Sequence, residues 1–166
     1  MDLLKNIEVK IVNGVNAKLQ EINAIKMNNK KMLNLKLYEN LELQYIVLKN
    51  KKTKEIIGVA SISHSPNQLK NQTKELSNIK NKLLNNYSFT ESLWVEEKYL
   101  NKGYGKLLLS EIYKLWFKNK NKYLLRFIRH SSNLFKSNYY KDNLYLSDFH
   151  DNENHRNYSI FLKEKQ

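Results

Sequence analysis

One stretch of the sequence, residues 93–116 (LWVEEKYLNKGYGKLLLSEIYKLW), constrains the fold more than any other. It begins with three apolar, β-prone residues, and the polar residues that follow cannot extend a buried strand. Gly103 and Gly105 come next, and apolar residues then recur at helical spacing. The stretch therefore predicts a short strand, a turn with two glycines and a helix.

A glycine-rich turn at the start of a helix is suited to binding an anion. The first N–H groups of a helix have no carbonyl acceptor within it, and glycine places no Cβ atom in front of them. The positive end of the helix dipole lies at the same place, so a phosphate or diphosphate is the natural ligand. Two glycines are also what an ordinary turn uses, and the spacing alone leaves both interpretations open.

The residues around this turn extend the pattern. The strand ends at Val95, and an aromatic residue stands at Tyr99. Gly103 and Gly105 complete the spacing, which resembles the acetyl-CoA signature of the GNAT N-acetyltransferase superfamily. The chain departs from that signature at Leu100, where the family usually has Arg or Gln, which removes a side-chain contact and leaves the backbone donors in place.

A second segment, residues 133–140, resembles another landmark of the same family. There Asn133 is followed by a helical pattern that ends in an aromatic residue and Tyr140. The Gly-Phe pair that usually comes next is replaced by Leu144-Tyr145.

The order of the expected elements covers most of the chain. Strands are expected at 7–12, 44–48, 56–63, 89–95, 122–129, 144–149 and 158–162, and helices at 15–32, 66–86, 106–116 and 131–140. The resemblance implies an α/β (α+β) fold with a mixed, mostly antiparallel central sheet, a splayed parallel strand pair and flanking helices, in one domain over 1–166. Gly58 fits the family's third strand and indicates a bulge or a close approach of backbone.

Residues 66–88 form a helical insertion, since the family usually joins these strands by a short turn. Leu69, Leu76, Ile79 and Leu83 recur at the spacing of an amphipathic helix. A lid over the acceptor site, a face for a homodimer and a loosely packed surface helix are all open interpretations.

The resemblance implies acetyl-CoA as the cofactor, with no metal. The backbone of Val95 would pair with the pantetheine arm, and N–H groups over 101–106 would hold the diphosphate. The expected cofactor-binding residues are Leu93, Trp94, Val95, Leu100, Asn101, Lys102, Gly103, Tyr104, Gly105, Lys106, Asn133 and Tyr140. Lys102 and Lys106 either add positive charge to this site or belong to an ordinary solvated surface.

The same resemblance implies two catalytic residues. Tyr140 is the candidate general acid, because a phenol with a pKa of about 10 stays protonated at neutral pH and can donate to a departing thiolate. Glu91 is the candidate base, either taking the proton of the acceptor ammonium through a water or simply attracting a cationic acceptor. His64 and His130 are weaker alternatives. Glu96 and Glu97 are expected to be solvated loop charges.

The composition of the chain limits the functions and locations to expect. The chain of 166 residues has a formal net charge of +13 and contains no cysteine, which excludes disulfides and thiolate catalysis. The charge favours anionic partners. The abundance of Lys, Asn, Ile and Tyr and the scarcity of Arg also fit an AT-rich genome. We see no signal-peptide pattern and no apolar run that would span a bilayer, and expect a cytoplasmic protein without a membrane partner.

The leading hypothesis is therefore an N-acetyltransferase that moves an acetyl group directly from acetyl-CoA to a primary amine. The acceptor is a small molecule, a protein or an aminoacyl-tRNA. The alternative is a non-catalytic basic module of the same fold that binds RNA or an acyl-CoA.

Overall fold

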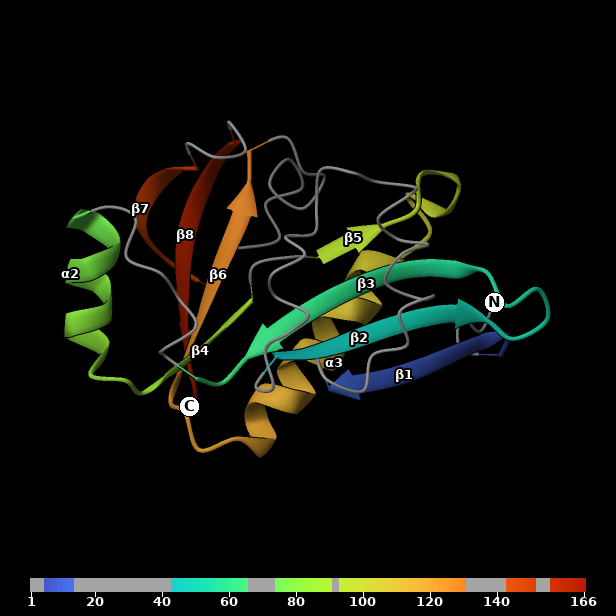
Figure 1. Ribbon diagram of the computed structural model, residues 1–166, viewed down its shortest axis with the longest axis horizontal. Coiled ribbons are helices and arrows are strands. Elements are labelled where there is room, and N and C mark those ends of the chain that lie inside the picture. The colour runs from blue at the N-terminus through green and yellow to red at the C-terminus, as the bar shows by residue number, and fades with distance from the viewer. Residues whose placement is uncertain (1–4, 14–42, 66–73, 91–92, 131–142, 152–155) are drawn as a thin grey trace. The chain divides into compact units, whose positions relative to one another are not determined.

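The computed structural model describes residues 5–13, 43–65, 74–90, 93–130, 143–151 and 156–166 (Figure 1). The expected helices at 15–32 and 131–140 lie outside these residues, as do Leu69, Glu91, Asn133 and Tyr140. The chain forms two compact units: unit 1 is Met1–Ile62 with Ser92–Leu115, and unit 2 is Ser63–Glu91 with Trp116–Gln166.

Unit 1 contains an antiparallel arrangement of strands. Its strands are β1 (Ile7–Asn13), β2 (Leu43–Asn50), β3 (Ile56–Ser63, whose last residue belongs to unit 2) and β5 (Leu93–Val95). β1 pairs with β2 over its whole length, and β5 pairs with β3 from Gly58↔Val95 to Ala60↔Leu93. These strands fall close to the predicted ranges because alternating apolar residues specify them locally.

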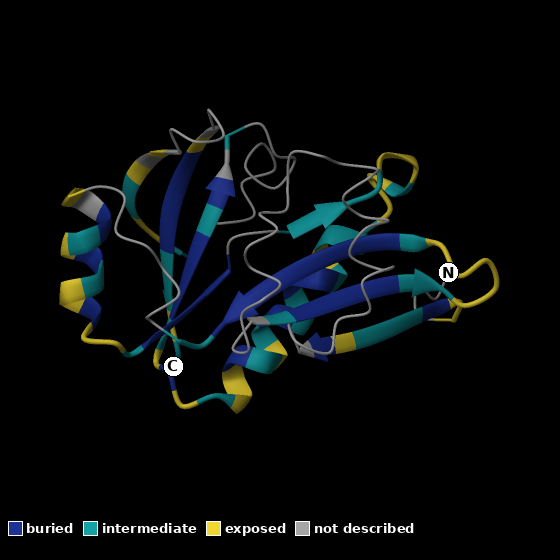
Figure 2. Ribbon diagram, in the orientation of Figure 1, coloured by how far each residue is buried: buried dark blue, intermediate teal, exposed yellow. Residues whose placement is uncertain are grey.

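A short 3₁₀ helix, η3 (Glu97–Tyr99), and the long helix α3 (Tyr104–Lys118) follow β5. The buried face of α3 includes Leu108, Leu109 and Ile112, at the spacing that the sequence predicts. Figure 2 shows β3 as an almost continuously buried strand, and its residues Ile57 to Ser63 are all buried.

The described residues of unit 2 include one further helix and four strands. They are α2 (Lys74–Leu83), β4 (Tyr87–Thr90), β6 (Tyr123–Arg129), β7 (Leu144–Asp151) and β8 (Arg156–Glu164). β4 runs parallel to β6, while β8 pairs antiparallel with both β6 and β7. A register shift between Tyr145 and Ser147 interrupts the β7–β8 pairing.

The predicted fold class is confirmed: the strands form a mixed, mostly antiparallel sheet with a parallel pair. The strand expected over 89–95 is described in two parts, β4 and β5, because residues 91–92 lie outside the described residues. β4 pairs with β6 as far as Thr90↔Arg126, and both parts pair with β3, β4 at Ser63↔Phe89 and β5 over three residue pairs.

Helix α2 is a packed part of unit 2. Leu76, Ile79 and Leu83 are buried together with residues of three strands, Tyr87, Phe89, Leu125, Tyr158 and Ile160. The described part of the predicted apolar stripe, Leu76, Ile79 and Leu83, is therefore packed inside this unit. Tyr87 and Ser88, the last two residues of the predicted insertion range 66–88, belong to strand β4.

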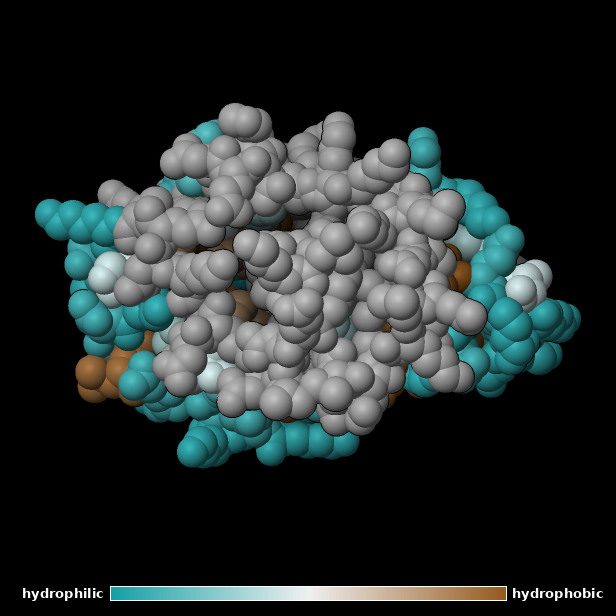
Figure 3. All heavy atoms as spheres, viewed as in Figure 1, coloured by the Kyte–Doolittle hydropathy of each residue, from teal (hydrophilic) through white to brown (hydrophobic). Residues whose placement is uncertain are grey.

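The described side chains visible in Figure 3 are mostly hydrophilic, in keeping with the lysine-rich composition. Exposed large apolar residues do occur, with Leu84 at 81% and Leu144 at 63% exposure. Among the described residues, no helix combines the length and the hydropathy that crossing a membrane requires.

Candidate functional site

The predicted strand, turn and helix are present in unit 1. β5 carries Leu93 to Val95, and the amide of Glu96 donates to the carbonyl of Ile57 at 2.7 Å, which extends the β3–β5 pairing by one bond. The amide of Tyr99 donates to the carbonyl of Glu96 at 2.8 Å and closes η3. The chain is therefore fixed on both sides of the polar bend.

The turn between η3 and α3 depends on left-handed backbone at two positions. Asn101 has φ 62° and Gly103 has φ 90°. Asn tolerates the left-handed region better than most residues, and glycine enters it without steric cost. The first glycine of the pair is thus required by the path of the chain itself.

The first hydrogen bond of helix α3 runs from the amide of Leu107 to the carbonyl of Gly103 at 3.1 Å, so Gly103 directly precedes the first helical residue, Tyr104. Gly105 is therefore in the first helical turn, and the prediction that both glycines belong to the preceding turn is wrong for Gly105. The amides of Gly103, Tyr104 and Gly105 have no acceptor within the helix. The first turn contains no acidic residue that would offset the positive helix end.

Gly105 has no steric reason of its own to be glycine. A Cβ atom added there would lie 4.0 Å from its nearest neighbour, Leu93 Cδ2, which is ordinary contact. Glycine inside a helix costs roughly 0.5–1 kcal/mol relative to alanine. Among the described residues, the place of a Cβ atom at Gly105 is therefore open, in the same helical turn whose first amides have no acceptor.

Gly58, by contrast, is required by packing. A Cβ atom there would lie 2.6 Å from the backbone oxygen of Trp94 and 3.1 Å from Leu108 Cδ1. Of the two predicted explanations for Gly58, close approach of backbone is the one observed. The contact sets the position of β5 and α3 against β3, and so the position of the turn between them.

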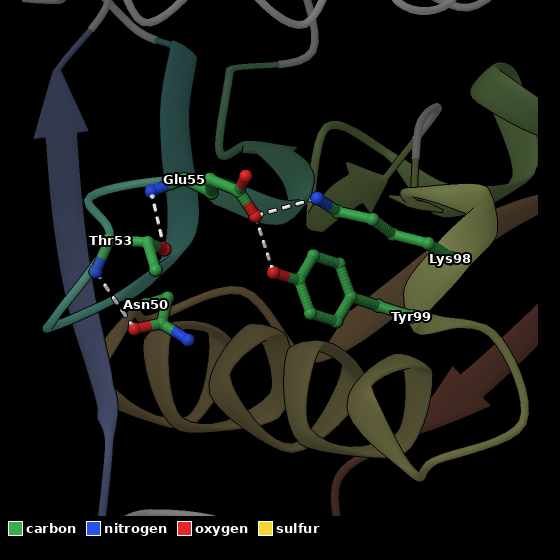
Figure 4. Close-up of polar contacts among 5 residues, drawn as sticks. All are labelled: Asn50, Thr53, Glu55, Lys98 and Tyr99. Carbon is green, nitrogen blue, oxygen red and sulfur yellow. Dashed lines mark hydrogen bonds and ion pairs between the residues drawn. The ribbon is translucent and has the colours of Figure 1, made fainter.

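A carboxylate from the β2–β3 turn supports the bend. Glu55 Oε2 accepts hydrogen bonds from Lys98 Nζ and from Tyr99 Oη, both at 2.7 Å (Figure 4). The bond from Lys98, followed by that from Tyr99, lowers the pKa of Glu55, and the same bonds raise the pKa of Lys98 and of Tyr99. Glu55 was not predicted as a site residue, because a polar turn carries no local pattern that indicates a partner more than forty residues away.

The predicted cofactor-binding residues of this stretch are all in one place. Leu93, Trp94, Val95, Gly103, Tyr104 and Gly105 are half-buried, while Leu100, Asn101, Lys102 and Lys106 are exposed. Trp94 packs against the buried cluster of Val12, Tyr45, Val47 and Val59, so its side chain serves the core. Lys102 Nζ lies 5.9 Å from the centroid of the Tyr99 ring.

The two glutamates after Val95 differ from each other. Glu97 is exposed, as predicted. Glu96 is half-buried, and its Oε2 atom is buried without a hydrogen-bond partner. The prediction of a solvated charge is therefore wrong for Glu96, because strand β5 ends one residue earlier and holds it against the sheet.

His64 belongs to a buried polar network in unit 2. Its Nδ1 lies 2.6 Å from Ser88 Oγ, and Asn121 Nδ2 donates both to Ser88 Oγ at 3.1 Å and to the His64 carbonyl at 3.0 Å. Burial, and after it the positive charge of Lys165, lower the pKa of His64. The ring is thus neutral at physiological pH and joins the end of β3 to β4.

His130 lies in a second network of unit 2, at the end of β6. Ser159 Oγ donates to Asp148 Oδ1 at 2.7 Å, and His130 Nε2 lies 2.9 Å from the same Ser159 oxygen. The Ser159 bond is the main cause that lowers the pKa of Asp148. Among the described residues, no three His, Asp or Glu side chains gather closely enough to hold a metal ion.

Comparison with known proteins identifies the family of this chain. The family model of the Acetyltransferase (GNAT) family matches residues 18–158. The chain therefore belongs to the GNAT acetyltransferase family. A search of curated protein sequences gives no significant match.

Solved structures with a similar fold include N-acetyltransferases. Arabidopsis thaliana NAA60 in complex with acetyl-CoA is 12% identical, with a TM-score of 0.68 and coverage of 95% of this chain and 98% of that one. The Escherichia coli ribosomal-protein-S18-alanine N-acetyltransferase is 11% identical, with a TM-score of 0.61 and coverage of 95% and 94%. A Salmonella typhimurium enzyme that modifies the N-terminal serine of ribosomal protein L7/L12 is 10% identical, with a TM-score of 0.60 and coverage of 98% and 96%. At these identities the likeness concerns the fold.

Proposed function

We propose that this protein is an acetyl-CoA-dependent N-acetyltransferase that transfers the acetyl group directly to a primary amine. The observation that carries the proposal is the start of α3, where the first amides have no acceptor within the helix and no described atom comes closer than 4.0 Å to the place of a Cβ atom at Gly105. Family membership and the acetyl-CoA held by the Arabidopsis structure support the same cofactor.

The residues of the turn fit a diphosphate in chemical terms. The backbone N–H groups of Gly103, Tyr104 and Gly105 would donate to its oxygens, and the first helical turn adds no negative charge. Lys102 and Lys106 are exposed nearby and would add positive charge. β5 has β3 as its partner strand, and we propose that the other edge of Val95 takes the pantetheine amide.

When bound, the cofactor supplies an acetyl group activated as a thioester. The chain has to orient it, accept the proton of the acceptor ammonium and protonate the departing sulfur. We assign proton acceptance to Glu91, through a water, and proton donation to the phenol of Tyr140. Asn133 would hold the pantetheine arm. These assignments rest on the resemblance, since the three residues lie outside the described part of the chain.

The proposed acceptor is defined only by its chemical class, a primary amine. The bacterial relatives named above act on the amino group of a ribosomal protein, which makes protein N-termini the first acceptors to assay. Small amines and aminoacyl-tRNA are the other two classes, and the net charge of +13 favours any acceptor that carries negative charge.

The experiment is an assay of CoA release from acetyl-CoA over a panel of peptide, polyamine and aminoacyl-tRNA acceptors. Tyr140→Phe and Glu91→Gln are each expected to lower kcat by about 10²–10⁴-fold, the usual contribution of a general acid or base. Tyr145→Phe and Glu97→Gln are matched controls, because both side chains are exposed.

Unchanged turnover in Tyr140→Phe and Glu91→Gln would overturn these two assignments. A protein that transfers no acetyl group and binds RNA in a strongly salt-dependent way would instead be the non-catalytic basic module.

A further inference from the structure

The contact between the β2–β3 turn and η3 has a consequence for the cofactor turn. Glu55 receives hydrogen bonds from two successive residues, Lys98 and Tyr99, that follow it by 43 and 44 positions. Figure 4 shows both side chains converging on one carboxylate oxygen. Because two donors share this acceptor, the position of the bend is restricted more than by a single hydrogen bond.

Glu55 is itself held by the turn that carries it. The amide of Asn50 donates to the Glu55 carbonyl at 2.9 Å, and the amide of Glu55 lies 3.3 Å from Thr53 Oγ1. Asn50 Oδ1 accepts from the amides of Lys52 and Thr53 at 2.9 and 3.1 Å. These hydrogen bonds therefore restrict the backbone position from which the Glu55 carboxylate extends.

Tyr99 connects Glu55 to the start of helix α3. Its ring packs edge to face against Tyr104, with centroids 6.0 Å apart and planes at 87°. Tyr104 is the first residue of α3, directly after Gly103. The path from Glu55 through Tyr99 to Tyr104 thus ends at the amides that the proposed diphosphate site uses.

We propose that Glu55 is a positioning residue that holds the cofactor turn in its binding geometry. This inference rests on the proposed function. Lys98 and Glu55 are 57% and 45% exposed, and an ion pair at that exposure adds little to global stability. The expected effect is local, because the turn next to Tyr99 contains left-handed backbone at both Asn101 and Gly103. A preorganised turn binds more tightly because less order has to be imposed on binding.

The test measures acetyl-CoA affinity by calorimetry and the KM and kcat of acetyl transfer in the full chain. Glu55→Ala and Tyr99→Phe are each expected to raise the Kd and KM for acetyl-CoA by about tenfold, the size of one lost hydrogen bond to a charged group, with kcat nearly unchanged. Glu55→Gln keeps an acceptor oxygen and should recover part of the affinity. Glu97→Ala removes the same charge from an exposed site within η3 and should bind like the wild type.

If Glu55 acted only through its charge, its removal would change the Kd for acetyl-CoA in the opposite direction. Removing Glu55 adds net positive charge near an anion site, so a purely electrostatic role would lower the Kd at low salt. Tyr99→Phe leaves the charge unchanged and separates the two effects, and circular dichroism confirms that each variant is folded. A wild type that binds acetyl-CoA together with variants that bind equally well would overturn this inference alone. A wild type that binds no acetyl-CoA would overturn the proposed function.

Discussion

Gly103 and Gly105 are two residues apart and meet different physical demands. Gly103 has φ 90°, a conformation that side chains other than glycine rarely adopt. Gly105 is helical and has open space where a Cβ atom would stand. The first glycine is explained by the fold, whereas the described residues give no reason for the second, and we propose that it serves a ligand that approaches the backbone.

Alanine at each position separates these roles. Gly105→Ala is expected to leave the free energy of unfolding unchanged or raise it by up to about 1 kcal/mol, because alanine is the better helix former. The same change should weaken acetyl-CoA binding, because the added methyl group occupies the space in front of the helical amides. Chemical denaturation and calorimetric titration measure the two effects.

Gly103→Ala is the matched comparison and should lower the free energy of unfolding by roughly 1–2 kcal/mol through backbone strain. Equal acetyl-CoA affinity in Gly105→Ala and the wild type would mean that the open space at Gly105 serves no ligand.

Through His64, the stability of the protein is expected to depend on pH. Its pKa is lowered in the folded protein, while in the unfolded chain it stays near 6.5. As pH falls below about 6.5, the unfolded state takes up a proton that the folded state does not, so stability should decrease toward pH 5. The loss ends once the pH passes below the folded pKa.

His64→Gln should flatten the stability profile over this window in urea melts at several pH values. His150→Gln is the control, because His150 is exposed and makes its side-chain contact, at 2.7 Å, with Asn157 on the neighbouring strand. A slope that survives in His64→Gln would show that another group takes up the proton.

At the scale of elements, the pairing of β5 with β3 positions the turn. β5 has only three residues, and Gly58 lets its backbone come within reach of β3 and α3. A strand of that length has little pairing of its own, so its place depends on this contact.

Gly58→Ala is therefore expected to lower the free energy of unfolding by roughly 1–3 kcal/mol, since a Cβ atom 2.6 Å from the Trp94 oxygen forces backbone to move. Hydrogen exchange should show faster exchange at the Glu96 amide, which bonds to Ile57. Ala60→Gly, at a buried position of the same strand, should cost stability without displacing β5. Unchanged protection at Glu96 in Gly58→Ala would contradict this account.

The sequence predicted elements well where the pattern is local. Residues 56–63 are a short, mostly apolar run preceded by a polar turn, and β3 has those bounds. The strand predicted over 89–95 is described in two parts, and of these only β4 also pairs with β6. Pairing partners are set by the topology, and local propensity does not carry that information.

The same distinction holds for the site. The spacing of Val95, Tyr99, Gly103 and Gly105 identified the turn, because backbone geometry constrains the residue types there. Glu55 was missed, since a hydrogen bond across more than forty residues leaves no local pattern. Burial of Glu96 was missed for a related reason, as the end of β5 depends on its partner strand.

At the scale of the whole molecule, the family match covers residues 18–158 and so includes parts of both compact units. The net charge of +13 affects any assay with a polyanion, because lysine-rich surfaces attract phosphates without a built site. Salt separates the two kinds of binding: a site of backbone donors and apolar contacts keeps its affinity, while diffuse attraction is screened.

Thermal unfolding of the full chain with and without acetyl-CoA, at low and high salt, tests the central claim most directly. At a hundred times the dissociation constant, the ligand should add about 2.7 kcal/mol and raise Tm by roughly 5–10 °C. We expect most of this rise to survive high salt and to exceed the rise that ATP, a polyphosphate without pantetheine, produces. No rise, or a rise that ATP matches and salt removes, would contradict it and leave only a basic surface that attracts phosphates.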